Sequence, residues 1–390
     1  MDNSQLQRRR LIKAFGASLV LFNTGTIAKV ASEASKTSLT NKKIVWVVLR
    51  GAMDSINTLV PTFDRNLSSL RPTIHQKIKD ELLMLDKGYG LHPSLKNFHQ
   101  WYQNKQLLPI VAVGSGYDSR SHFDGQDYLE SGLSEINHDS GWLGRMANIS
   151  NKNAVALARS KPVTLRDKNG RNTSTWFPSS LKEADDDIYH SLMKMYQDDE
   201  LLLSRLKKGM EINDMVSMGS SKKRKLGKFV NLAKSCAKLM VGETGLDCAM
   251  LEMGGWDTHN NQHFRLSRQL SELDNGLLAL KNGLGEEWQN TVVMVATEFG
   301  RTAKENGTGG TDHGTASAMF LAGGAIKGGR VLGQWPGLAK EQLFEQRDLM
   351  PTTNSISWVK TVLAQHFGLS NAALRHVFPD NISYQESIII

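Results

Sequence analysis

The chain has 390 residues, of which 40% are hydrophobic and 22% are charged, values that are ordinary for a soluble globular protein. A chain of this length can bury a large core, and we expect one large domain with insertions. The formal net charge of +8 comes largely from two short runs at 8–10 and 222–225. No basic face with interleaved aromatic residues is evident, so no nucleic-acid binding is predicted. Cys236 and Cys248 are the only cysteines, which argues against a disulfide framework or a cysteine metal motif.

Residues 1–34 are predicted to be an export signal. Arg8 and Arg9 precede an arbitrary residue, two apolar residues and Lys13, and a moderately apolar stretch follows at 14–28. This stretch is shorter and more polar than the roughly 20 apolar residues of a membrane span. The pattern is typical of the twin-arginine route, with cleavage near Ala28 or Ala34; a basic amphipathic tail is the alternative. We therefore expect a periplasmic or otherwise exported protein that uses the twin-arginine machinery and keeps no stable transmembrane span after processing.

Five continuous apolar runs predict strands that are buried on both faces, as in a parallel sheet. They lie at 44–49, 108–113, 246–251, 291–296 and 318–322. Helical patterns separate them, and the clearest is a stripe of leucines predicted to face the sheet: Leu266, Leu270, Leu273, Leu277, Leu280 and Leu284. This alternation predicts an α/β fold with a wound, mostly parallel sheet and helices on both faces. Residues 35–390 would form one domain, with a polar helical insertion at about 181–240.

Charged and polar side chains accompany almost every predicted strand. They are Asp54 after the first run, Ser119, Arg120, Ser121 and His122 after the second, Asp257 and His259 after the third, Glu298 and Arg301 after the fourth, and Asp312 and His313 just before the fifth. Any one of them could be a helix cap or a turn residue. Ligands bind outside the carboxyl ends of strands in open α/β sheets, and crowded carboxylates need a cation between them. The sequence therefore predicts a divalent metal site.

Several motifs, in this order, resemble a known family. They include GLHP at 90–93, RSHFD at 120–124, GGWDTH at 254–259, TEFGRT at 297–302 and TDHG at 311–314, together with 49–51, Asp54, Asn57, 323–329 and 347–349. The chain resembles the exported proteins gathered as domain of unknown function 1501, within the alkaline phosphatase and sulfatase superfamily. This resemblance implies an alkaline phosphatase-like fold. One departure is that the first motif of the family usually reads Gly-Gly-x-Asp-Gly, whereas Ala52 and Ser55 replace two glycines here.

The resemblance also implies a set of metal ligands. Asp54 is similar to the first-strand ligand, Asp257 and His259 to a pair that holds one ion, and Glu298 and His313 to ligands from later loops, with Asp312 as a further candidate. One or two divalent ions are implied, and zinc, manganese, magnesium and calcium remain open. Ser121 occupies the position that looks like the nucleophile, and Ser119 is its rival.

Such a site would transfer a phosphoryl or related ester group. Arg120 and Arg301 could hold the anionic oxygens of the substrate through their planar guanidinium groups, or could form structural ion pairs. We therefore expect an exported metal-dependent hydrolase of a phosphate, sulfate or related ester, whose substrate is a small anionic ester or an envelope component. No residue lies in a sulfatase maturation motif, which argues against a formylglycine sulfatase. The alternative is a non-catalytic exported metal-containing protein that binds a partner or assists envelope assembly.

Overall fold

The structure is a computed structural model that describes residues 23–24, 42–168, 172–177, 192–200, 202–203, 206–207, 228–242, 245–380 and 387–390. Apart from 23–24, the predicted export signal at 1–34 lies outside the described residues. So does much of the insertion predicted at about 181–240. Within the described part of the chain, no helix combines the length and the apolar character needed to cross a membrane.

A nine-stranded sheet runs through the described molecule in the order β1-β8-β7-β9-β2-β10-β11-β6-β12. Its central strand, β2 (Lys43–Arg50), is parallel to both neighbours, β9 (Leu246–Gly254) and β10 (Thr291–Thr297). Among the strands from β2 to β12 in this order, only β11 (Ser317–Ala322) runs in the opposite direction, since it is antiparallel to β10 and to β6 (Leu107–Gly114). The mostly parallel sheet predicted from the sequence is confirmed, and the five apolar runs are β2, β6, β9, β10 and β11.

The remaining elements are short strands and the helices that cover the sheet. The strands are β1 (Asn23–Thr24), β3 (Leu59–Pro61), β4 (Leu83–Met84), β5 (Tyr89–Leu91), β7 (Asn153–Ala156), β8 (Asn172–Thr175) and β12 (Thr353–Asn354), of which β3, β5 and β4 form a separate small sheet. The α-helices are α2 (Leu67–Leu70), α3 (Lys96–Gln103), α4 (His122–Ser131), α5 (Trp142–Ser150), α8 (Lys228–Val241), α9 (Gln262–Leu284), α10 (Ser355–Phe367) and α11 (Asn371–Val377). Short 3-10 helices are η1 (Lys79–Glu81), η2 (Asp86–Gly88), η3 (Val163–Leu165), η4 (Gly285–Asn290) and η5 (Lys340–Gln342).

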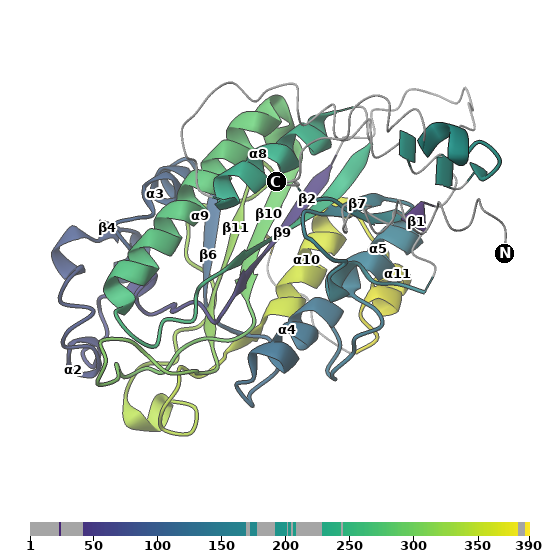
Figure 1. The fold of residues 1–390 in the computed structure, drawn as a ribbon. Helices are drawn as coiled ribbons and strands as arrows, with labels where there is room; N and C mark the ends of the chain where they lie inside the picture. The colour runs from purple at the N-terminus through teal and green to yellow at the C-terminus, as the bar shows by residue number, and fades with distance from the viewer. Residues whose placement is uncertain are drawn as a thin grey trace.

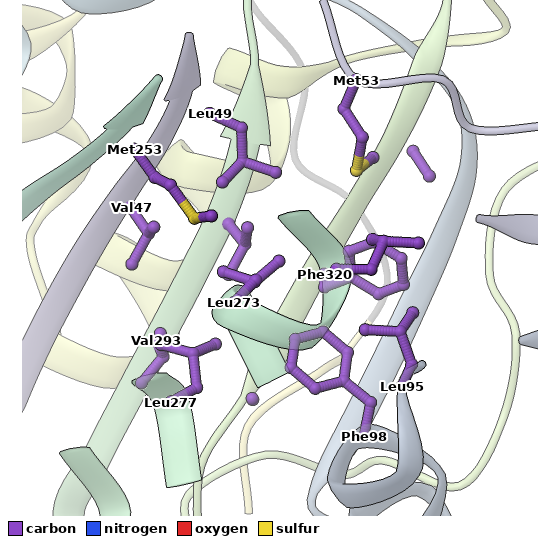
Figure 2. Packing of buried hydrophobic residues seen from close by; sticks show 14 of the residues in the cluster. Val47, Leu49, Met53, Leu95, Phe98, Met253, Leu273, Leu277, Val293 and Phe320 are labelled. Atoms are coloured by element: carbon purple, nitrogen blue, oxygen red, sulfur yellow. The ribbon is translucent and has the colours of Figure 1, made fainter. Parts of the chain in front are cut away.

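Helices cover both faces of the sheet, as predicted. In Figure 1, α3, α8 and α9 lie on one side of the strands and α4, α5, α10 and α11 on the other. Side chains of β2 alternate accordingly, with Val47 in the first core and Trp46 in the second. Figure 2 shows Leu273 and Leu277 of α9 against Val293 of the sheet. Every leucine of the predicted α9 stripe is at most 2% exposed, so the stripe faces the core.

His366 supplies a testable pH dependence of this fold. Its side chain is 1% exposed, and its Nε2 lies 3.1 Å from the carbonyl oxygen of Lys43. Burial lowers the pKa of His366 to about 4, so the unfolded chain binds more protons than the folded chain below about pH 6.5. The contribution of His366 to the free energy of unfolding is fully present above that pH. As the pH falls to 4, protonation of this group is expected to lower the free energy of unfolding by about 3 kcal/mol. Urea unfolding at several pH values measures it.

The matched variant is His366→Gln, whose side chain does not titrate in this range. Its unfolding free energy should fall less steeply than that of the wild type between pH 6.5 and 4, because one protonation event is removed. Parallel pH profiles for the two proteins would contradict the expectation. Comparing the two proteins also removes the contribution of His92, whose pKa burial likewise lowers to about 4.

Candidate metal centre

Loops at the carboxyl edge of the sheet bring the candidate residues together. Asp257 and His259 follow β9, Arg301 follows β10, and His313 lies just before β11. Because β11 runs antiparallel to β10, the segment that precedes β11 starts at the same edge. Arg301 and His313 form an antiparallel bridge there, and the first residue of α4, His122, completes the group.

One carboxylate oxygen, Oδ1 of Asp257, lies at the centre of this group. Its neighbours are Arg301 Nη1 at 2.8 Å, His259 Nε2 at 3.0 Å, His313 Nε2 at 3.2 Å and His122 Nε2 at 3.6 Å. Ligand atoms of His122, Asp257 and His313 all lie within 4.8 Å of one another. The Nε2 atoms of His259 and His313 are themselves 3.0 Å apart. His122, Asp257 and His313 therefore form one group of mutually close ligand atoms, and His259 lies beside this group, against Asp257 and His313.

The outer nitrogen of each imidazole faces an oxygen acceptor. The Nδ1 contacts are His122 to Glu298 Oε1 at 2.8 Å, His259 to Asp312 Oδ1 at 3.3 Å, and His313 to the carbonyl oxygen of Arg120 at 3.1 Å. An oxygen acceptor favours the tautomer in which Nδ1 carries the proton, which leaves a lone pair on Nε2. Three such lone pairs and a carboxylate oxygen repel one another unless a cation or a proton lies between them. The donor set therefore fits a divalent cation, and the oxygen partners behind the rings are those that orient metal-ligating histidines.

Glu298 is the buried support of His122. Its carboxylate, which is 0% exposed, also accepts hydrogen bonds from Gly51 N and Thr297 Oγ1, each at 2.8 Å. Burial alone would raise the pKa of Glu298, but the hydrogen bond from His122 and its other donors outweigh burial and lower it. In turn, the hydrogen bond to Glu298 raises the pKa of His122. Gly51 has φ +119°, and a side chain there would come within 2.6 Å of the backbone nitrogen of Asp257, so this close approach requires glycine.

Arg301 is buried beside the cluster, and part of its guanidinium group is not used as a hydrogen-bond donor. Its side chain is 0% exposed, and within the described part of the chain its Nε and Nη2 have no hydrogen-bond partner. Burial would raise the pKa of Asp257, but Arg301 and the three imidazoles outweigh it and lower the pKa. A buried guanidinium with unused donors next to a cation site can bind the oxygens of an anionic group.

Asp54 lies apart from this cluster. Its side chain is 1% exposed, and its Oδ2 accepts hydrogen bonds from Arg71 and Gln262. Among the described residues, the group of ligand atoms within 4.8 Å of one another does not include Asp54. Two residues earlier, Ala52 has φ +61°, a left-handed backbone conformation that glycine adopts more easily than alanine. This conformation costs an alanine about 1 kcal/mol.

The segment before α4 contains the remaining predicted residues. The guanidinium of Arg120 forms ion pairs with Asp348, at 2.8 Å, and with Glu345, while its carbonyl holds His313. Ser121 is the N-cap residue of α4, and its hydroxyl makes no capping hydrogen bond. It directly precedes His122 and is partly buried, whereas Ser119 is exposed. Ser121 is thus the neighbour of His122 in the chain.

His122 was not predicted as a metal ligand, although it lies in the motif at 120–124. Asp312 and Glu298, which were predicted as ligands, contact the outer nitrogens of His259 and His122. The signal for His122 was present, because the residue follows β6 at the same sheet edge as the other loops. In this motif the sequence instead predicted a role for the neighbouring Ser121, as the nucleophile.

A family model described as a protein of unknown function (DUF1501) matches residues 41–378, and the chain belongs to this family. The resemblance predicted from the motifs is therefore confirmed. No curated protein matches the sequence.

Several solved structures are similar to this chain at low sequence identity. Alkaline phosphatase from the Antarctic bacterium TAB5 has 12% identity, covers 72% of this chain and 90% of its own, and gives a TM-score of 0.37. Phosphonate monoester hydrolase of Agrobacterium radiobacter has 10% identity, coverage of 84% and 74%, and a TM-score of 0.39. A Bacteroides thetaiotaomicron protein described with glycosaminoglycan metabolism has 11% identity, coverage of 85% and 74%, and a TM-score of 0.44. All three TM-scores are below 0.5.

Proposed function

We propose that the protein is an exported metal-dependent hydrolase of a phosphate, sulfate or related ester. The observation that carries this proposal is the convergence of three imidazole Nε2 atoms and Arg301 Nη1 on Oδ1 of Asp257. Export by the twin-arginine route, with its machinery as a partner, is proposed from the arginine pair at the start of the sequence.

Asp257, His122, His259 and His313 are the residues that would hold the ion. Three nitrogen donors and one oxygen suit zinc, and manganese next, better than magnesium or calcium, which prefer oxygen ligands. A bound divalent ion supplies a Lewis acid that lowers the pKa of a hydroxyl or water and stabilises developing negative charge.

The chain itself would supply orientation, charge and the nucleophile. Glu298, Asp312 and the carbonyl of Arg120 would fix the three rings by accepting their Nδ1 protons. Arg301 would direct its free donors to an anionic oxygen of the ester. Ser121 would be the attacking hydroxyl, with Ser119 as the rival. Because its side chain is occupied by Asp348 and Glu345, Arg120 would position His313 rather than hold the substrate.

The second candidate is a non-catalytic metal-containing protein that binds a partner or assists envelope assembly. One observation favours it: Asp54, the ligand expected from the first strand, is held in a buried ion pair with Arg71. A centre without this carboxylate would hold one ion, whereas ester transfer with two ions clamps both the attacking and the leaving oxygen.

Metal analysis combined with ester hydrolysis separates the two candidates. We expect purified protein to contain about one equivalent of zinc or manganese and to hydrolyse a phosphate monoester, a phosphate diester or a sulfate ester. Ser121→Ala should lower kcat by at least about a thousandfold with the metal retained, whereas the matched variant Ser119→Ala should keep its activity. Metal without turnover on any of these esters would favour the non-catalytic candidate. Activity lost only in Ser119→Ala would reverse the assignment of the nucleophile.

A further inference from the structure

A cavity of about 610 Å³ opens beside the candidate metal centre, a size typical of small-molecule sites. Asp312, whose carboxylate supports His259, is one of its lining residues. The lining comes from three segments of the chain, the first of which includes α2 and the last η5: Asn66, Ser69, Leu70, Thr302, Lys304, Glu305, Asn306, Asp312, Leu338, Lys340, Leu343, Gln346 and Arg347. Asp312 therefore belongs both to the lining of the cavity and to the surroundings of the candidate metal centre.

The acidic and basic side chains that line the cavity differ in whether they already have protein partners. Both acidic side chains are occupied, since Glu305 accepts the backbone N–H groups of Thr73 and Ile74 and Asp312 contacts His259. Both lysines, Lys304 and Lys340, are exposed, and their ammonium groups have no protein partner within the described part of the chain. Three cationic side chains, Lys304, Lys340 and Arg347, and two carboxylates, Glu305 and Asp312, line the cavity, so its lining has a net charge of +1.

Two further features favour an organic anion over an isolated ion. Buried Leu338 and Leu343 supply apolar lining, against which a carbon skeleton can pack. Arg347 Nη1 donates a hydrogen bond to the carbonyl oxygen of His313 at 2.9 Å, so one cationic side chain of the cavity contacts the loop of a metal-ligating histidine. A molecule in the cavity would be held at a fixed position relative to the centre.

We propose that this cavity binds a second anionic group of the substrate, so that the substrate is an organic ester carrying a further carboxylate, sulfate or phosphate. The inference rests on the proposed function, because it names the class of ester that the same site receives. The ester group to be cleaved lies at the metal centre beside Arg301, and the second anion lies between Lys304 and Lys340. A simple monoester leaves this second subsite empty.

Aryl sulfonates test the subsite without turnover, because their C–S bond is not an ester. With zinc-loaded full-length protein, calorimetry should show benzene-1,3-disulfonate binding about tenfold more tightly than benzenesulfonate. In the double variant Lys304→Gln/Lys340→Gln this ratio should fall to about one. The double variant Lys79→Gln/Lys96→Gln makes the same charge change at exposed residues outside the cavity and should keep the wild-type ratio. A third ligand, 3-sulfobenzoate, distinguishes a carboxylate from a sulfate in the second subsite.

Each outcome bears on one proposal. Equal binding of mono- and disulfonate by the wild type, or an equal loss in both double variants, would overturn the cavity proposal and leave ester hydrolysis standing. A preference for the disulfonate that is lost only in the cavity variant, in a protein that cleaves no ester, would support the cavity and count against the hydrolase.

Discussion

An Asp257→Asn variant is expected to lose its bound metal and its ester hydrolysis while staying folded. Oδ1 of Asp257 is the atom on which three imidazoles and Arg301 converge, and a neutral amide is a poor ligand for a divalent cation. Asparagine keeps the shape of the side chain and an oxygen acceptor for Arg301 Nη1, but it leaves the buried guanidinium without its carboxylate, so the free energy of unfolding should fall by about 1–3 kcal/mol. Metal affinity should fall by at least about a hundredfold, measured by competition with a chromogenic chelator.

Glu298→Gln provides a graded comparison at the same site. Glutamine can still accept a hydrogen bond from His122 Nδ1 but removes the negative charge behind the ring, and such changes weaken metal binding by about 10- to 100-fold. The expected order of affinity is therefore wild type, then Glu298→Gln, then Asp257→Asn. If Asp257→Asn bound metal as tightly as the wild type, the cation would have to lie elsewhere, and the proposed centre would be wrong.

The sheet was predictable because burial on both faces leaves a strong local signal. Strands such as β2 and β10 are continuous apolar runs, and each ends where charged residues begin. The rule that ligands gather at the carboxyl edge then placed distant residues such as Asp257 and His313 near one another, and they lie 3.2 Å apart. Even the antiparallel β11 fits, because its preceding loop starts at that edge.

The sequence could not predict which residues present ligand atoms and which orient them, because this depends on the contacts of individual side-chain atoms. Whether a histidine presents Nε2 or Nδ1 to a cation is decided by the oxygen behind its ring, and for His122 that oxygen belongs to Glu298, 176 residues away. The same limit applies to the ion pairs. Arg120 meets Asp348 across 228 residues, a pairing that neither local pattern nor residue type reveals.

Arg71→Met is expected to destabilise the fold by about 3–5 kcal/mol, because it leaves the carboxylate of Asp54 buried without its cation. Arg71 is 0% exposed and also donates hydrogen bonds to the carbonyl oxygens of Thr302 and Ala303. Those bonds fix the chain just after Arg301, so the variant should also weaken metal binding. Urea unfolding of the metal-free protein measures the loss of stability without the contribution of a bound ion.

Two further variants show whether buried charge is the cause. Asp54→Asn/Arg71→Met carries no charge at this position and should recover part of the stability lost in the single variant, since the unpaired carboxylate is the main penalty. Glu345→Gln breaks the ion pair of Arg120 with a side chain that is 59% exposed, and it should cost at most about 1 kcal/mol. A double variant less stable than Arg71→Met would mean that the hydrogen bonds to Thr302 and Ala303, and not the charge of Asp54, dominate the role of Arg71.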